Sequence, residues 1–101
     1  MSTKRRIKVY FEVRYVGPDT IYLRNDHTYM AMFGNRPHAL GVYDEDHEWG
    51  VHDPQYIVLC DGQYEEFWPQ GELMTTDEWV KFVDYIIGLE EKINDAVMKD
   101  E

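Results

Sequence analysis

The sequence predicts an α+β fold, in which an antiparallel sheet of about five strands carries one C-terminal helix packed on one face. Two patterns lead to this prediction. Residues 7–15 alternate with period two, which is typical of a half-buried strand. Residues 76–98 repeat apolar side chains at steps of three and four, which is typical of an amphipathic helix. A length of 101 residues predicts a single domain covering residues 1–101.

The N-terminal part is predicted to be a meander of short antiparallel strands. After the strand at 7–15, Gly17-Pro18-Asp19 indicates a turn, and residues 20–24 would resume as a strand with Ile21 and Leu23 pointing inward. A further turn leads to a strand at 28–33. The solvent face of this sheet would carry Lys8, Tyr10, Arg14, Tyr22 and Arg24.

The middle of the chain predicts a short strand at 39–43, a charged loop at 44–48 and then a hairpin. Residues 56–60 form an apolar run rich in β-forming side chains. The Asp61-Gly62 pair that follows is a preferred two-residue hairpin turn, so residues 63–68 are expected to return as the second strand.

The C-terminal helix has a clear start signal. Thr75 and Glu78 form a capping-box pattern in front of the apolar repeat. Gly88 lies in the middle of the helix, at a cost of about 1 kcal/mol relative to alanine. We expect it either to let the helix pass close to the sheet or to mark a kink.

Charge is divided unevenly along the chain. Residues 1–36 contain seven Lys or Arg against three Asp or Glu, a net +4, whereas residues 37–101 contain three against seventeen, a net −14. Fifteen of the 101 residues are aromatic, which distinguishes the chain from acidic disordered proteins. A folded, acidic and aromatic surface is suited to a basic partner, and we expect the basic side chains of residues 4–24 and the carboxylates of residues 44–66 to lie on different faces.

The acidic segments are the first candidate site. Carboxylates spaced along a surface can imitate nucleic-acid phosphates in a Lys/Arg-lined groove, and neighbouring aromatic rings can anchor an interface. Trp49 follows a run of charged residues and precedes glycine, which favours the tip of a loop. The alternative is a solubilising loop with core aromatics nearby. The predicted partner-binding residues are Asp44, Glu45, Asp46, Glu48, Trp49, Glu65 and Glu66.

A metal or small-ligand site in the His/Asp-rich segment 38–53 is a second hypothesis. Imidazole and carboxylate groups suit Zn²⁺, Mn²⁺ or Fe²⁺. The pattern from His47-Glu48 to His52 is one residue longer than the zincin motif and is not on a predicted helix. Scattered surface histidines are the alternative, and we expect neither a metal nor a cofactor. The four histidines are His27, His38, His47 and His52.

Nucleic-acid binding through the basic N-terminal sheet is a third hypothesis. Tyr10 and Tyr22 could stack on bases, although the net −14 of the remaining chain would repel phosphates. The basic patch could instead pair with the acidic part of the same chain or of a second copy. Its members are Lys4, Arg5, Arg6, Lys8, Arg14 and Arg24.

The chain carries no nucleotide-binding or hydrolase motif, and its one cysteine, Cys60, has no histidine placed beside it, so we expect it not to be an enzyme. In size, acidity and lack of a catalytic motif it is similar to small inhibitor proteins. These include phage-encoded anti-CRISPR and other anti-defence proteins, and immunity proteins that block nuclease toxins. The similarity is one of class and implies stoichiometric binding to a basic nucleic-acid-handling protein. We expect a cytoplasmic location, in the host cytoplasm for a phage protein, because no membrane span or secretory signal is present in the sequence.

Overall fold

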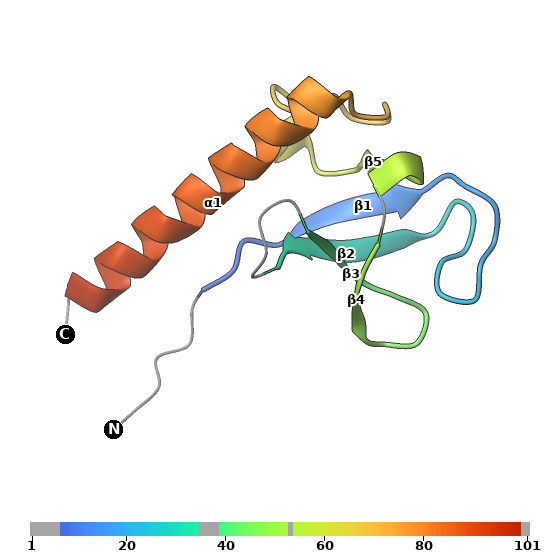
Figure 1. The fold of residues 1–101 in the computed structure, drawn as a ribbon, viewed down its shortest axis with the longest axis horizontal. Coiled ribbons are helices and arrows are strands. Elements are labelled where there is room, and N and C mark those ends of the chain that lie inside the picture. Colours follow the sequence, from blue (N-terminus) through green and yellow to red (C-terminus); the bar gives the residue numbers. More distant parts are fainter. Residues whose placement is uncertain (1–6, 35–38, 53, 100–101) are drawn as a thin grey trace.

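The computed structural model describes residues 7–34, 39–52 and 54–99. Within these ranges an antiparallel sheet of five strands has the order β4-β3-β2-β1-β5, and the helix α1 packs on one face (Figure 1). The α+β prediction is therefore confirmed, with one C-terminal helix on the sheet. The elements are β1 (Phe11–Tyr15), β2 (Thr28–Phe33), β3 (Leu40–Tyr43), β4 (Trp49–Val51), the 3-10 helix η1 (Pro54–Tyr56), β5 (Ile57–Leu59), the 3-10 helix η2 (Gly62–Tyr64) and α1 (Thr76–Lys99).

The core lies between the inner face of the sheet and α1. The predicted alternation is present over β1, where Phe11, Val13 and Tyr15 are buried while Glu12 is exposed, but residues 7–10 lie outside the strand and Ile7 is 40% exposed. Phe82 of α1 contacts the rings of Phe11 and Phe33, with centroids 5.2 and 5.6 Å apart. Burial of such large apolar side chains supplies most of the favourable free energy of folding. The outer face of the sheet has no helix packed on it among the described elements.

Helix α1 begins as the capping box predicts. The Thr75 N–H donates to Glu78 Oε1 over 2.9 Å, and the Glu78 N–H donates to Thr75 Oγ1 over 3.3 Å. The helix then runs without interruption to Lys99. The expectation that Gly88 lets the helix pass close to the sheet is wrong, because a Cβ placed there would meet nothing within 4 Å, and α1 shows no sharp bend in Figure 1.

Residues 20–24 form a turn and not the predicted strand. The Thr20 hydroxyl accepts the backbone N–H groups of Tyr22 and Leu23, and the Thr20 N–H donates to the Leu23 carbonyl. These short-range bonds compete successfully with strand pairing. Leu23 is 4% exposed and joins the core as predicted, whereas Ile21 is 76% exposed.

The hairpin predicted at Asp61-Gly62 does not form, and residues 63–68 are not a strand. Asp61 instead caps η2, where its Oδ1 accepts the Gln63 N–H over 3.0 Å. Tyr64 and Trp68 lie four residues apart and are both buried. Residues at this spacing share one face of a helical turn, and they would share one face of a strand as well. β5 pairs with β1 (Val13 opposite Leu59), so the fifth strand is present with a different neighbour.

Two side chains of α1 hold the segment that precedes β1. The Ile7 N–H donates to Asn94 Oδ1 over 2.8 Å, and the Val9 N–H donates to Glu90 Oε2 over 2.9 Å. Asn94 Nδ2 also donates to the Ile7 carbonyl over 3.2 Å. Glu90 and Asn94 are buried, so these bonds satisfy polar groups that would otherwise be left without partners.

Across the described ranges, no helix has both the length and the apolar content that crossing a membrane requires.

Candidate partner-binding face

The open face of the sheet carries a cluster of exposed aromatic rings. Trp49 lies between Tyr43, at a centroid distance of 5.4 Å, and Tyr10, at 5.7 Å. Tyr43 is directly opposite Trp49 in the β3–β4 pairing, and Tyr10 immediately precedes β1. We call this cluster the aromatic face. It comprises Tyr10, Tyr43 and Trp49 together with Met30, Met32 and Val51, which the strand registers place on the same side.

The Trp49 ring lies beside Gly41 of β3. A Cβ built on Gly41 would come 3.8 Å from Trp49 Cε3 and 3.7 Å from Met32 Cγ. The Trp49 ring therefore covers a position on β3 that has no side chain, and it reaches across the sheet toward Tyr10. Trp49 belongs to strand β4 and is 41% exposed, so the expectation that it stands at a loop tip is wrong, whereas its accessibility agrees with a binding role.

Two of the predicted carboxylates are engaged within the protein. Asp44 is buried, accepts the Asp46 N–H over 3.0 Å, and lies 3.3 Å from His52 Nε2. Glu45 accepts the Tyr29 O–H over 2.6 Å and lies 3.4 Å from His27 Nδ1. The hydrogen bond from Tyr29 lowers the pKa of Glu45, and burial together with that bond raises the pKa of Tyr29 to about 12. These contacts of Asp44 and Glu45 stabilise the conformation of the loop between β3 and β4.

Asp46 and Glu48 are exposed, and neither forms an ion pair with a described residue. Glu48 also lines an open hollow of about 310 Å³ beside β4. These two carboxylates are therefore the members of the predicted acidic loop that remain accessible to a partner. The hollow is lined by Tyr22, Asp44, Glu48, Trp49, Gly50, Val51 and His52.

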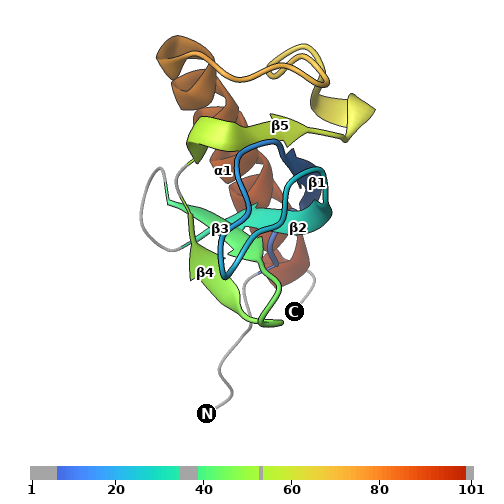
Figure 2. The same cartoon turned by 90° about the vertical axis from the view of Figure 1, so that its right-hand side faces the viewer.

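Glu65 and Glu66 lie in a different part of the molecule. They follow η2, after β5, whereas Trp49 belongs to β4 at the opposite edge of the sheet (Figure 2). Both side chains are exposed, but the neighbouring Tyr64 and Trp68 are core residues, and the Phe67 ring stacks on Tyr85 of α1 at 4.3 Å. The structure thus does not unite these two carboxylates with the acidic loop in one site.

The described basic side chains of the N-terminal third are paired with carboxylates. Lys8 Nζ lies 3.8 Å from Glu90 Oε1, Arg14 Nε lies 3.5 Å from Asp26 Oδ1, and Arg24 Nη1 lies 3.9 Å from Asp19 Oδ2. Arg24 is also close enough to Glu45 to lower the pKa of that carboxyl. The carboxylates in these three ion pairs lie outside residues 44–66, so the pairs do not test the expected separation from that segment, and only the proximity of Arg24 to Glu45 departs from it. Lys4, Arg5 and Arg6 lie outside the described residues.

The described histidines have separate neighbours. His27 contacts Glu45, His52 contacts Asp44, and the His47 ring packs against Tyr43 at 6.1 Å. Among the residues that the structure describes, no three His, Cys, Asp or Glu side chains come together as metal ligands would. His38 and Asp53, which belong to the predicted metal-binding segment, lie outside those residues.

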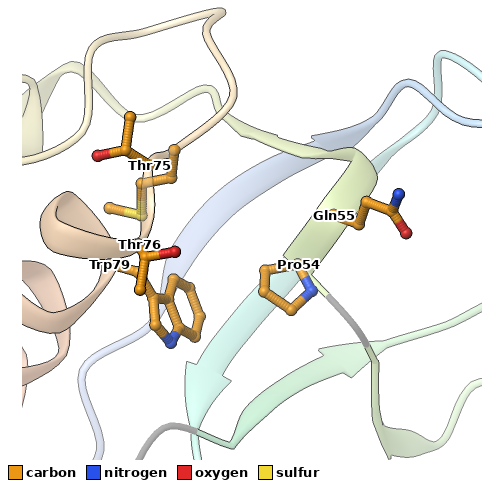
Figure 3. Close-up of a pocket in the computed structure, with 6 residues that line it drawn as sticks. Pro54, Gln55, Thr75, Thr76 and Trp79 are labelled. Atoms are coloured by element: carbon orange, nitrogen blue, oxygen red, sulfur yellow. The ribbon is translucent and has the colours of Figure 1, made fainter.

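A second cavity, of about 170 Å³, lies between η1 and the start of α1 (Figure 3). Trp79 and Pro54 face it from opposite sides, and none of the seven predicted partner-binding residues lines it. The backbone donors of Thr75 and Glu78 beside it are already used by the capping box. The lining residues are Pro54, Gln55, Met74, Thr75, Thr76 and Trp79.

No protein-family model matches the chain, and no curated protein or solved structure matches it. The aromatic face is thus the feature from which a function can be argued. The sequence reasoning placed Tyr10 on the outer face and Tyr43 beside the acidic loop, but did not bring them together. The period-two pattern already assigned Tyr10 to that face, whereas the contact with Trp49 depends on the β2–β3 and β3–β4 registers.

Proposed function

We propose that this protein acts by binding another protein stoichiometrically through the aromatic face, as an inhibitor of a basic, nucleic-acid-handling protein. The observation that carries the proposal is the exposed cluster of Tyr10, Tyr43 and Trp49 on the side of the sheet opposite α1. Large rigid rings that are accessible and adjacent are the side chains that most often anchor protein interfaces. An inhibitor of the anti-CRISPR, anti-defence or immunity type would act in this way.

Charge supports a basic partner. Asp46 and Glu48 lie in the loop that leads to Trp49 and have no ion-pair partners among the described residues, and Glu12 is exposed opposite Met30 on the aromatic face. The whole chain has a formal charge of −10. This field would accelerate association with a basic surface, while the rings would slow dissociation.

Nucleic-acid binding is the competing proposal for the same surface, since exposed tyrosines on a sheet can stack on bases. The carboxylates around the aromatic face argue against it, because they would repel phosphate groups. Lys8, Arg14 and Arg24 are each paired with a carboxylate, which reduces the positive charge available to a nucleic acid.

Affinity capture from the native host tests whether Tyr43 anchors the interface. Tyr43→Ala is the variant bait, and Tyr85→Ala is its control. Tyr43 and Tyr85 are the same residue type and are both 40% exposed, but Tyr85 lies on α1. We expect the wild type and Tyr85→Ala to retain the same basic protein in mass spectrometry. Tyr43→Ala should weaken the complex by about 2 kcal/mol, or roughly thirtyfold in Kd, if the ring is an interface anchor.

Charge reversal provides an independent arm. Asp46→Lys with Glu48→Lys should slow association with the captured protein and flatten its salt dependence, whereas Asp84→Lys with Glu91→Lys on α1 should have a smaller effect. Equal binding by the wild type, by Tyr43→Ala and by Asp46→Lys with Glu48→Lys would place the interface elsewhere. Capture of RNA in place of protein would support the competing proposal.

A further inference from the structure

The two edges of the sheet differ in whether another described segment of the chain pairs with them. At the β5 edge, Leu73 forms an antiparallel bridge with Val58, and the Gly71 N–H donates to the Leu59 carbonyl over 3.1 Å. The chain thus covers that edge with its own backbone. β4 is the other edge, and no described segment pairs with its outer side (Figure 1). An uncovered edge offers backbone groups to an added strand.

The hydrogen-bond pattern between β3 and β4 identifies which backbone groups of β4 point outward. The Asp44 N–H donates to the Glu48 carbonyl and the His52 N–H donates to the Leu40 carbonyl, both over 3.1 Å. Antiparallel pairs alternate between bonded and non-bonded positions, so the N–H and C=O groups of Trp49 and Val51 point away from β3. Two residues spaced in this way present two donors and two acceptors along one line.

The space beside these groups is open. The hollow of about 310 Å³ is lined by all five consecutive residues from Glu48 to His52. Its lining includes Trp49 and Val51 from the outer face as well as Gly50 and His52 from the inner face, so it runs along the edge of β4. Val51 is 77% exposed, which leaves an apolar side chain beside the open backbone.

The charges around the β4 edge favour a basic segment as the added strand. Asp46 and Glu48 are exposed carboxylates close to the start of β4, and neither is paired with a described basic group. β4 itself carries no lysine or proline, the residues that commonly protect an edge. Arginine on an added strand could approach these carboxylates and also stack its guanidinium on the exposed Trp49 ring.

We propose that β4 binds an extended, arginine- or lysine-containing segment of the partner as an additional antiparallel or parallel strand. This inference rests on the proposed function, since it names the part of the basic partner that the aromatic face receives. Main-chain hydrogen bonds to Trp49 and Val51 would hold the segment, and its alternate side chains would lie on the Trp49 side. A second copy of this chain is a less suitable occupant, because each copy carries a formal charge of −10.

The test uses an eight-residue peptide of alternating arginine and valine as the probe, titrated against the full-length protein and followed by NMR. At saturation we expect hydrogen exchange of the Trp49 and Val51 amides to slow by about tenfold or more, while the Gly88 amide in α1 is unchanged. The same peptide with N-methylated valines cannot pair on one side and should bind about tenfold more weakly or worse. A glutamate–valine peptide should not bind.

Two protein variants separate the backbone from the side chain. Val51→Pro removes the outward-pointing N–H, a change that edge strands tolerate, whereas Val51→Ala shortens the side chain and keeps the N–H. We expect Val51→Pro to lose the arginine–valine peptide by about tenfold or more and Val51→Ala to lose less. If Val51→Pro does not fold, the N-methylated peptide and the amide exchange of the wild type decide the matter.

Failure of this inference can be distinguished from failure of the proposed function. If the captured partner is lost by Tyr43→Ala but retained by Val51→Pro, the aromatic face binds the partner without strand addition and the inference is wrong. If neither variant affects capture, the proposed function is wrong as well. Protection of the Trp49 and Val51 amides that depends on protein concentration alone, with a dimer in sedimentation, would assign the edge to a second copy and would also overturn the inference.

Discussion

Tyr29 connects three parts of the molecule through a single hydroxyl group. Its Oη accepts the Arg24 N–H over 2.8 Å from the β1–β2 connection and its O–H donates to Glu45 in the loop that leads to β4. The hydrogen bond between Tyr29 and Glu45 contributes stability in a defined pH range. The lowered pKa of Glu45 stabilises the fold above the ordinary pKa of the carboxyl, and the contribution is lost as the pH falls through the folded value. The raised pKa of Tyr29 acts in the opposite direction, so its contribution is complete below pH 10 and is lost as the pH rises through about 12.

Tyr29→Phe should raise the pKa of Glu45 toward its ordinary value, because the substitution removes the main hydrogen bond that favours the carboxylate. It should also lower the free energy of unfolding by about 1 kcal/mol at neutral pH, since the Arg24 N–H loses its acceptor. Carbon-13 NMR titration of Glu45 and urea denaturation measure the two effects.

Tyr15→Phe is the matched control. Its hydroxyl also lies near the core but donates to the Pro18 carbonyl and touches no carboxylate, so the Glu45 titration should not change. An unaltered pKa of Glu45 in Tyr29→Phe would mean that His27 and Arg24 are sufficient to hold the carboxylate ionised.

At the scale of elements, helix α1 contains a glycine that packing does not require. The space that a Cβ on Gly88 would occupy is open, and the helix continues through it. Gly88→Ala should raise the free energy of unfolding by about 1 kcal/mol and the Tm by roughly 4–8 °C, because alanine lowers the backbone entropy of the unfolded chain. Calorimetry measures both.

Gly71→Ala is the opposite case in the same chain. Its surroundings are equally open, but its φ of 82° lies in the left-handed region that disfavours an L side chain. We expect this variant to lose about 1 kcal/mol. Destabilisation by Gly88→Ala would show that the backbone of α1 at this position is not that of an ordinary helix interior.

The two longest patterns and the short strands predicted at 28–33, 39–43 and 56–60 could be read from the sequence, whereas β4 and the conformations of residues 20–24 and 63–68 could not. The nine-residue alternation around β1 and the capped apolar repeat of α1 contain enough positions to define a period. Residues 20–24 also alternate, but the Thr20 hydroxyl accepts two backbone N–H groups and closes a turn. The strand pairing that five residues could form does not compete with these local hydrogen bonds. At Asp61-Gly62 the residue pair fits a hairpin turn, but Asp61 Oδ1 accepts the Gln63 N–H, and the Phe67 and Trp68 N–H groups both donate to the Tyr64 carbonyl, so local turns form in place of a second strand.

The candidate site follows the same logic. The sequence located the acidic loop and Trp49, because runs of charge and isolated tryptophans are visible locally. It could not show that Asp44 is buried against His52, or that Tyr10 reaches Trp49, because both contacts join residues on different strands. The position of Gly41 beside the Trp49 ring had no local signal, because the two residues lie on neighbouring strands.

For the whole molecule, the dominant electrostatic term should be repulsion among carboxylates. The formal charge is −10, and the described basic residues of the N-terminal third, Lys8, Arg14 and Arg24, are already paired. Adding NaCl from about 0.02 M to about 0.5 M should therefore raise the Tm at pH 7, because screening weakens the repulsion. The effect should shrink near pH 4.7, where the net charge is close to zero. A lower Tm in salt at pH 7 would mean that the ion pairs outweigh the repulsion.

The attachment of Ile7 and Val9 to Asn94 and Glu90 joins residues 87 and 81 positions apart. On the ribosome, at about 5–20 residues per second, the Ile7 N–H waits roughly 4–17 s for its acceptor to be made. During that interval the nascent strand exposes Val9 and Phe11 to water and to other nascent chains. The charged Lys8, Glu12 and Arg14 between its apolar residues interrupt what would otherwise be a continuous aggregation-prone segment. The alternation that later separates core from solvent therefore also protects the chain before its last helix exists.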